Sequence, residues 1–316
     1  MTWSSSMLTR EQGLIKKFHQ FQEMFNFFVK SKKNPISPKT TYWLENHELH
    51  NYFSTCMWNL DTDWQHYIKE KYSLNNQVCL SIGCGTGNLE RSIIEIGCAK
   101  NVDAFDISAT SILNAKKLAE TNGLKINYFE ADANNIILKN NKYDFVVAHN
   151  SIHHIKNLEH IMQQISNSLK RDGLFIMVEF VGPTRFQWSD QQLKIINDIL
   201  EMLPNKFKKI SQNGQNYKTE FNHETLKGYL DSDPSEAVRS GDIISITNNF
   251  FEILEERNMG GTILHLLLAE IINNFDESKE EERTMVKLLC YFEKMLIESR
   301  QVSSDFKLVV CRKKMV

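Results

Sequence analysis

The residues best suited to chemistry lie around a glycine-rich turn that follows an apolar run. Residues 78–90 read Val-Cys-Leu-Ser-Ile-Gly-Cys-Gly-Thr-Gly-Asn-Leu-Glu, so Gly83, Gly85 and Gly87 stand at alternate positions. Glycine tolerates positive φ and lets a ligand approach the backbone, which suits a nucleotide-like cofactor. A second apolar run ends at Asp106, where an acid can accept hydrogen bonds from ribose hydroxyls.

Histidines follow a later apolar run and can act on a bound substrate. His149 and Asn150 come directly after residues 145–148, and His153 and His154 stand in the turn behind them. A neutral imidazole takes a proton from a hydroxyl or amine near neutral pH, which makes His154 and His149 candidate bases. Packing at the start of a helix is the alternative for the histidine pair.

Further candidates lie beyond the next apolar run. Glu179 ends that run and is either a base, a partner for a substrate ammonium group, or a solvated acid. Arg185 can bind a carboxylate or phosphate, and Gln187 and Trp188 can line an acceptor pocket. His265 can reach the same site from a later helix, and a surface position is its alternative.

Short apolar strands alternate with helices from residue 78 to residue 180, which predicts an α/β fold with a parallel sheet covered on both faces. Strands are predicted over 78–82, 102–106, 126–130, 145–148, 174–180, 251–257 and 306–312. Helices are predicted over 89–96, 108–121, 158–169, 189–203, 242–249, 262–274 and 280–300. Ligands of such sheets bind at the carboxyl ends of the strands.

The N-terminal segment has a helical pattern, with Leu14 and four phenylalanines from Phe18 to Phe28 on one face. Such a stripe either packs on its own domain or serves as a dimer helix or a lid over a substrate. Tyr42 and Trp43 follow a polar linker with two prolines and would belong to that lid. The sequence therefore predicts a possible homodimer through this helix.

Composition excludes several classes of protein. The chain has 316 residues and a formal net charge of −2, and its basic clusters are short, so a nucleic-acid substrate is not expected. No apolar run approaches the length of a membrane span, and no signal-type core follows the N-terminus, so we expect no membrane association and a cytoplasmic location. Six cysteines without a Cys-x-x-Cys pair are expected to stay reduced thiols.

Taken in order, these motifs resemble those of the class I S-adenosylmethionine-dependent methyltransferases. The resemblance rests on residues 81–87, on Asp106, on Glu-Ala-Asp-Ala at 130–133 and on the segment 143–154. The flanking sequences at 178–188, 233–240 and 260–265 are similar to a bacterial subgroup of these enzymes. A nicotinamide dehydrogenase is disfavoured, because the last glycine falls two residues after the second, not three.

The resemblance implies a Rossmann-like, doubly wound seven-stranded sheet whose last strand is antiparallel, with an N-terminal helical lid and C-terminal helical insertions. It divides the chain into a lid or interface region at 1–74 and a methyltransferase domain at 75–316. The core of that domain takes in 75–180, 241–258 and 305–316. The segments 181–240 and 259–304 are insertions on the substrate side.

The resemblance also implies a set of residues for S-adenosylmethionine and its product S-adenosylhomocysteine. Those expected to contact the cofactor are Ser81, Gly83, Cys84, Gly85, Gly87, Asp106, Ile107, Asp132, Ala133, His149 and Asn150. Those expected at the acceptor are Tyr42, Trp43, Arg185, Gln187, Trp188 and His265, and the candidate catalytic groups are His154, Glu179 and His149.

Two departures from the family pattern affect these expectations. Many members carry Asp or Glu where this chain has Ser81, so the cofactor's ammonium group is expected to be held less strongly. The carboxylates of metal-dependent members are missing around Asn150, so no metal is expected.

The function expected from the resemblance is methyl transfer from S-adenosylmethionine to an oxygen or nitrogen of a small molecule. Two alternatives stay open: a non-catalytic scaffold that binds the cofactor, and another reaction of the sulfonium, such as lysis or group transfer. Neither composition nor motif identifies the acceptor.

Overall fold

The computed structural model describes residues 46–53, 63–210, 216–222 and 233–314. The phenylalanine stripe of the N-terminal segment lies outside the described residues, as do Tyr42 and Trp43. The possible lid and dimer helix therefore stay predictions.

Seven strands form one mixed sheet, which confirms the predicted fold. The strands are β1 (Gln77–Ile82), β2 (Ala99–Asp106), β3 (Ile126–Glu130), β4 (Tyr143–His149), β5 (Leu169–Phe180), β6 (Phe251–Gly260) and β7 (Phe306–Lys313). Their order across the sheet is β3-β2-β1-β4-β5-β7-β6. The pairs from β3 to β5 are parallel, and β7 runs antiparallel to both β5 and β6.

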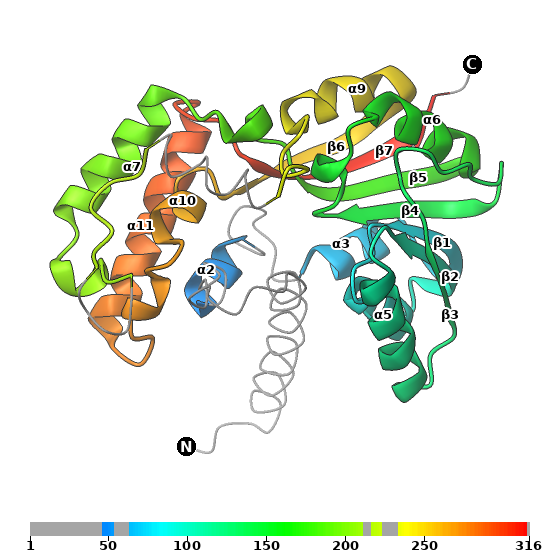
Figure 1. Cartoon of the computed structure of the whole chain (residues 1–316), viewed down its shortest axis with the longest axis horizontal. Coiled ribbons are helices and arrows are strands. Elements are labelled where there is room, and N and C mark those ends of the chain that lie inside the picture. Colours follow the sequence, from blue (N-terminus) through cyan, green and yellow to red (C-terminus); the bar gives the residue numbers. More distant parts are fainter. Residues whose placement is uncertain (1–45, 54–62, 211–215, 223–232, 315–316) are drawn as a thin grey trace.

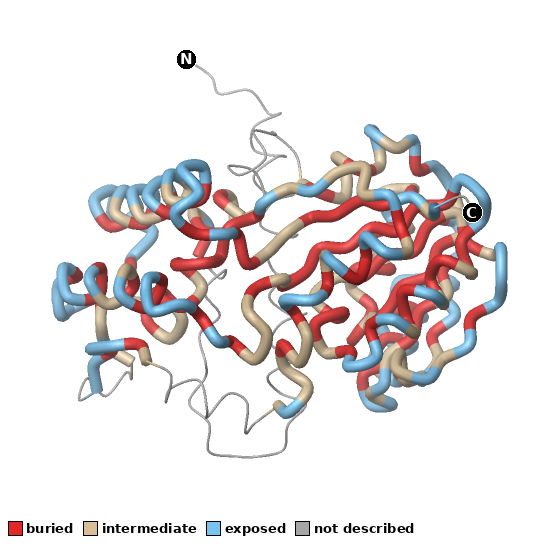
Figure 2. The backbone as a smooth tube through the Cα atoms, turned by 90° about the horizontal axis from the view of Figure 1, so that it is seen from above, coloured by how far each residue is buried: buried red, intermediate tan, exposed pale blue. Residues whose placement is uncertain are grey.

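Helices cover both faces of the sheet because successive strand residues point to opposite sides. Cys79 of β1 and Val147 of β4 pack in a core with one set of helices, whereas Leu80 and Val146 pack in a second core with another set. The first set is α3 (Trp64–Lys71), α4 (Asn88–Glu95) and α5 (Ala109–Thr121), and the second is α6 (Leu158–Ser168) and α9 (Ile243–Phe250). Figure 1 shows these layers, and Figure 2 shows the buried strands running between exposed helix surfaces.

The remaining helices gather at one end of the sheet around a third hydrophobic core (Figure 1). They are α2 (His47–Asn51), α7 (Asp190–Met202), α10 (Leu264–Leu268) and α11 (Glu280–Glu298). Ser189 begins α7 with a capping box, in which its side chain and that of Gln192 each bond the other's backbone. Phe180, at the end of β5, packs in this helical cluster and joins it to the sheet.

Three predicted boundaries are wrong for identifiable reasons. The helix predicted over 262–274 breaks after α10, because Glu270 adopts a positive φ of 70° before a 3-10 turn at Ile272–Asn274. β5 begins at Leu169, because Leu169 pairs with Tyr143 of β4 on the far side of a register shift. β6 continues to Gly260 through two register shifts against β7.

Among the described helices, none combines the length and the apolar character that crossing a membrane requires. The five cysteines in the described part of the chain are free thiols.

Candidate active site

The strand order reverses between β1 and β4, the two neighbours from which the sheet grows outward in each direction. Ligands of open α/β sheets bind where the order reverses, at the carboxyl ends of the strands. The glycine loop follows β1 at this edge, and the segment 150–154 follows β4. The sheet therefore places the two groups of predicted site residues side by side.

Two loop glycines are required by the protein's own packing as well as by their positive φ. A Cβ on Gly83 would stand 2.4 Å from Cβ of Ser151, in the segment after β4. A Cβ on Gly87 would stand 2.1 Å from the hydroxyl of Tyr128, which donates a hydrogen bond to the Gly87 carbonyl. All three loop glycines have positive φ, between 53° and 78°. A larger residue at 83 or 87 would push the loop away from its neighbours.

Asp106 joins the glycine loop to the next turn of the sheet edge. One carboxylate oxygen accepts a hydrogen bond from the Gly85 amide at 2.9 Å, and the other accepts one from the Ser108 amide at 2.8 Å. The neighbouring Ile107 is 68% exposed, an apolar side chain against which a flat ring can pack. This pairing of a fixed acid with an exposed apolar side chain suits a ribose and its base.

Ser81 is buried beneath the loop, and its hydroxyl donates a hydrogen bond to Glu90 of α4. The Glu90 side chain is fully buried, and its second carboxylate oxygen has no hydrogen-bond partner among the described residues. Burial raises the pKa of Glu90 to about 7. The loop thus has a carboxyl group beneath it, although that group comes from α4 rather than from β1.

Asp132 and Ala133 follow β3 and are both half-buried. Asp132 accepts hydrogen bonds from the backbone and side chain of Asn134, each at 2.8 Å, and from the side chain of Asn135. These bonds, led by the one from the Asn134 amide, hold the pKa of Asp132 below its usual value. The turn is fixed with a carboxylate that stays ionised.

His149 and Asn150 close the end of β4. The His149 ring stacks on Trp64 of α3, with centroids 5.8 Å apart and planes 8° apart. Burial lowers the pKa of His149 to about 4, so the ring is neutral at pH 7. Asn150 has a positive φ of 50°, and its side-chain oxygen is buried without a hydrogen-bond partner among the described residues. Such an acceptor is suited to a ligand donor.

Glu179 and His153 form a buried ion pair. The Glu179 side chain is fully buried and accepts hydrogen bonds from the amides of Ser151 and Ile152 and from Nδ1 of His153. Burial opposes charge on both groups, but their mutual attraction raises the pKa of His153 to about 10 and lowers that of Glu179. Glu179 therefore orients the segment after β4 and is not a solvated acid.

The second histidine lies beside this pair at the surface of the site. The rings of His153 and His154 have centroids 4.2 Å apart. Nε2 of His153 lies 3.3 Å from one oxygen of Glu236, and Nε2 of His154 lies 3.7 Å from the other. Burial and the charge of His153 lower the pKa of His154. His154 is thus a neutral, half-buried imidazole, as a general base must be.

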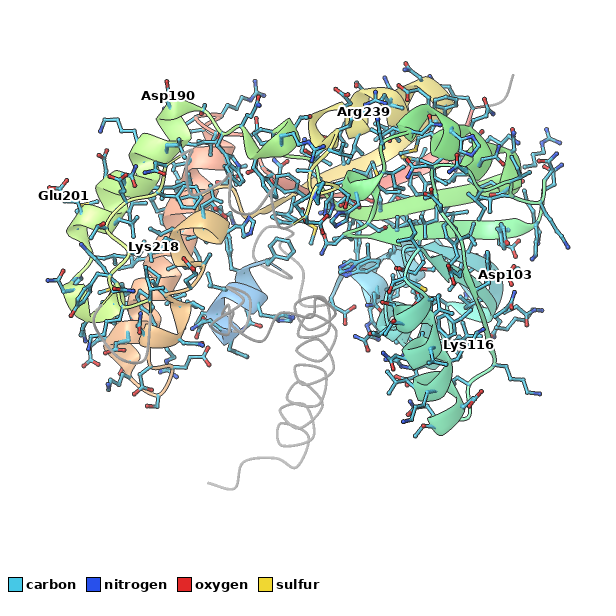
Figure 3. The ribbon with its side chains drawn as sticks, in the orientation of Figure 1. Asp103, Lys116, Asp190, Glu201, Lys218 and Arg239 are labelled. Atoms are coloured by element: carbon cyan, nitrogen blue, oxygen red, sulfur yellow. The ribbon has the colours of Figure 1, made fainter. Side chains whose placement is uncertain are left out.

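The loop that carries Glu236 is tied down from several sides. The Val238 amide donates to the His153 carbonyl at 3.1 Å, and the Arg185 amide donates to the Ala237 carbonyl at 2.7 Å. The Arg185 guanidinium donates to the carbonyl of Glu236 at 3.3 Å. Arg239, labelled in Figure 3, forms a two-pronged ion pair with Glu159 of α6. Arg185 thus holds this loop in place.

The other predicted acceptor residues lie at different depths. Gln187 is exposed. Trp188 is 3% exposed, stacks on Phe186 and donates its indole N–H to Asp305 at 2.8 Å. His265 packs edge-on against Phe306, and burial lowers its pKa to about 4. His265 is thus half-buried beside Phe306.

A cavity of about 360 Å³ lies between the end of β5 and the start of α7. Its walls include Val181–Pro183, Gln192 and 301–305. None of the predicted cofactor or catalytic residues lines it. We therefore place the site at the glycine loop and not in this cavity.

Sequence reasoning missed Glu90 and Glu236 as members of the site. Glu90 lies nine residues after Ser81, and only the helical turn of α4 brings it back beneath the loop. Glu236 is 57 residues beyond Glu179 in the chain. The segment 233–240 stood out as a motif in the sequence, but nothing local ties it to the histidines.

The comparisons with known proteins agree with this placement. The family model of the methyltransferase domain matches residues 80–177. A ubiquinone biosynthesis O-methyltransferase from Glaesserella parasuis is 31% identical over 117 residues, which cover 35% of this chain and 49% of the relative. A ribosomal protein L11 methyltransferase from Bacillus pumilus is 27% identical over 134 residues, 42% of each chain. The chain spans about half the length of the curated relatives it matches.

Among solved structures, an S-adenosylmethionine-dependent methyltransferase from Mesorhizobium loti aligns with a TM-score of 0.44 at 13% identity. The alignment covers 76% of this chain and 92% of that one.

Proposed function

Because this chain belongs to the class I S-adenosylmethionine-dependent methyltransferases, we propose that it transfers a methyl group from that cofactor to an oxygen or nitrogen of a small molecule. S-adenosylmethionine supplies an activated methyl group on a sulfonium, ready for in-line displacement. The protein's task is to position the two reactants, exclude water and receive a proton.

Five features of the loop edge support cofactor binding. Asp106 keeps lone pairs for two ribose hydroxyls while it holds Gly85 and Ser108 in place. Ile107 offers an apolar side chain to the adenine, and the Asp132 turn lies at the end of the next strand. Asn150 offers a buried oxygen to a donor of the ligand. Glu90 supplies the negative charge that Ser81 lacks, so its buried carboxylate pairs with the cofactor's ammonium group.

His154 is the general base of this proposal. Its pKa lies below the usual value, so the ring is neutral and accepts a proton above pH 6.5. Glu179 and His153 are positioning residues, since both are buried and bonded to the segment that carries His154. His149 is not a base in this proposal, because its pKa is low. Its neutral ring stacks on Trp64.

The observation that carries this proposal is the hydrogen bond from Gly85 to Asp106 within the segment that matches the methyltransferase domain. It gives the glycine loop and the acid at the end of β2 one fixed geometry before any ligand arrives. A small acceptor fits better than a macromolecule because the segment after β4 is enclosed by the clamped loop 233–239.

Three measurements test the proposal. Calorimetry with S-adenosylmethionine and S-adenosylhomocysteine should give one site per chain, and no heat from either with folded protein would refute it. Mass spectrometry of a panel of hydroxyl- and amine-bearing metabolites should then reveal a product that gains one methyl group. His154→Gln should lower kcat about 10²–10⁴-fold at unchanged cofactor affinity. Gln163→Ala, on the exposed side of α6, is the control and should leave kcat unchanged.

A further inference from the structure

Three side chains bring their ligand atoms together at the outer edge of the site. One atom each from His153, His154 and Glu236 lies within 4.8 Å of the others. The closest approaches are 3.3 Å from His153 Nε2 to one Glu236 oxygen and 3.7 Å from His154 Nε2 to the other. Glu236 reaches them from a loop 82 residues further along the chain than His154.

Hydrogen bonds fix which nitrogen of His153 faces the cluster. Glu179 accepts the amide protons of Ser151 at 2.8 Å and Ile152 at 2.7 Å, as an ionised carboxylate does. Nδ1 of His153 must therefore donate to Glu179, and Nε2 is the atom that points toward Glu236. This is the carboxylate–histidine arrangement that orients an imidazole toward a metal.

The same reasoning fixes the second ring. The Ser235 hydroxyl donates its single proton to Asp233 at 2.7 Å, so its oxygen can only accept from Nδ1 of His154 at 3.1 Å. Nε2 of His154 then carries a lone pair and faces the Glu236 carboxylate. Two imidazole nitrogens and one carboxylate thus converge, and an oxygen on the far side of each ring holds it in place. An ion bound here would displace the proton that Nε2 of His153 shares with Glu236 in the metal-free protein.

We propose that His153, His154 and Glu236 form a binding site for a divalent first-row transition ion such as Zn²⁺. Two imidazoles and a carboxylate are the ligands of many catalytic zinc sites, which keep further positions open. Ligand atoms bound at about 2.0–2.1 Å to a tetrahedral ion lie about 3.3 Å apart, the separation found for His153 and Glu236.

The site is open on one side. The side chains of His154 and Glu236 are 22% and 26% exposed, whereas that of His153 is 8% exposed. The buried ligand is the one held by Glu179, and the exposed ones leave room for water or an oxygen of the acceptor. A bound ion would occupy the Nε2 lone pair of His154, so it would take the place of that base by lowering the pKa of the bound oxygen. Only this last role rests on the proposed function; the binding of the ion does not.

The test measures metal binding without cofactor or acceptor. The full chain, freed of tag and treated with EDTA, is titrated with Co²⁺ and with Zn²⁺ by calorimetry, and the visible absorption of the cobalt form is recorded. We expect one ion per chain. Glu236→Gln and His154→Ala should each weaken binding at least tenfold, the double variant should abolish it, and Ser235→Ala should weaken it about 10–100-fold.

Matched controls use groups outside the cluster. His160→Ala removes a histidine that bonds the Ile136 carbonyl, and Glu252→Gln removes an exposed carboxylate of β6. Both should bind cobalt as the wild type does. A wild type that binds no more Co²⁺ than the double variant, or controls that lose as much as the ligand variants, would overturn the metal site. If the ion binds but metal-stripped protein methylates its acceptor at the full rate, the ion takes no part in methylation. The proposed function then holds without the metal.

Discussion

The edge proposed to bind the cofactor and the edge proposed to bind the acceptor, called here the cofactor edge and the acceptor edge, are built in different ways. Asp106, the glycine loop and the Asp132 turn come from consecutive strand ends within 50 residues. The acceptor edge combines Glu179, the pair His153–His154 and Glu236, which long-range hydrogen bonds bring together. The first edge depends on local backbone geometry and the second on buried charge. Substitutions should therefore damage the first through ligand affinity and the second through stability.

The largest effect is expected at the buried charge of the acceptor edge. Glu179→Ala leaves His153 and two amides without their partner, and we expect the free energy of unfolding to fall by about 3–5 kcal/mol. Glu256→Gln removes the partner of Lys307 in a pair near the surface and should cost about 0–1 kcal/mol. Urea denaturation measures both. Equal losses would mean that the Glu179 pair carries no more stability than a surface pair.

At the cofactor edge, Asp106→Ala should weaken S-adenosylhomocysteine binding about 100-fold, because it removes charge-assisted hydrogen bonds to the ribose. Its effect on unfolding should stay smaller than that of Glu179→Ala. Asp198→Ala, which breaks an exposed pair with Lys194 on α7, is the control. Calorimetry measures these affinities. If Asp106→Ala binds S-adenosylhomocysteine as tightly as the wild type, Asp106 does not bind the ribose.

The ion pair of the acceptor edge also predicts a pH dependence. The pKa of His153 is about 10 in the fold and 6.5 when unfolded, so the fold binds the extra proton between these values. The stability that this charge provides is complete below pH 6.5 and is lost as the pH rises toward 10. Thermal unfolding in EDTA should therefore show a falling midpoint from pH 7 to 9. Replacement of His153 by Gln should flatten that slope.

The smallest effect is expected at Glu90, whose contribution to stability falls with rising pH as that of His153 does, but over a lower pH range. Its raised pKa means that stability falls as the pH rises from 4.5 to about 7, because the buried carboxyl must lose its proton. Glu90→Gln should therefore flatten this fall of stability with pH. It should also weaken the binding of S-adenosylmethionine about tenfold, because the charge that pairs with the ammonium group is lost. Affinity for 5′-methylthioadenosine, which lacks the ammonium group, should not change. If the variant loses affinity equally for both ligands, Glu90 does not contact the ammonium group.

The sequence predicted the strand ends that carry the proposed cofactor residues, but not the long-range contacts around Glu236, for a physical reason. Strand ends such as Asp106 are marked by local apolar patterns, and the glycines by the bend they allow. His265, an acceptor candidate with a surface position as its alternative, lies half-buried against Phe306 in the short helix α10. Glu236 was present in a recognisable motif, yet its position depends on long-range hydrogen bonds made by Val238, Arg185 and Arg239, which no local pattern predicts.

The close contact between Gly83 and Ser151 can couple the affinities of two ligands. Ser151 occupies the space where a Cβ would stand, so the glycine loop proposed to bind the cofactor touches the segment that leads to His153 and His154. A ligand that moves either segment must move the other. By thermodynamic reciprocity, whatever factor the cofactor imposes on the affinity for an ion or acceptor, the ion or acceptor imposes on the affinity for the cofactor. Cofactor titrations with and without Zn²⁺ would give that single coupling factor from both directions.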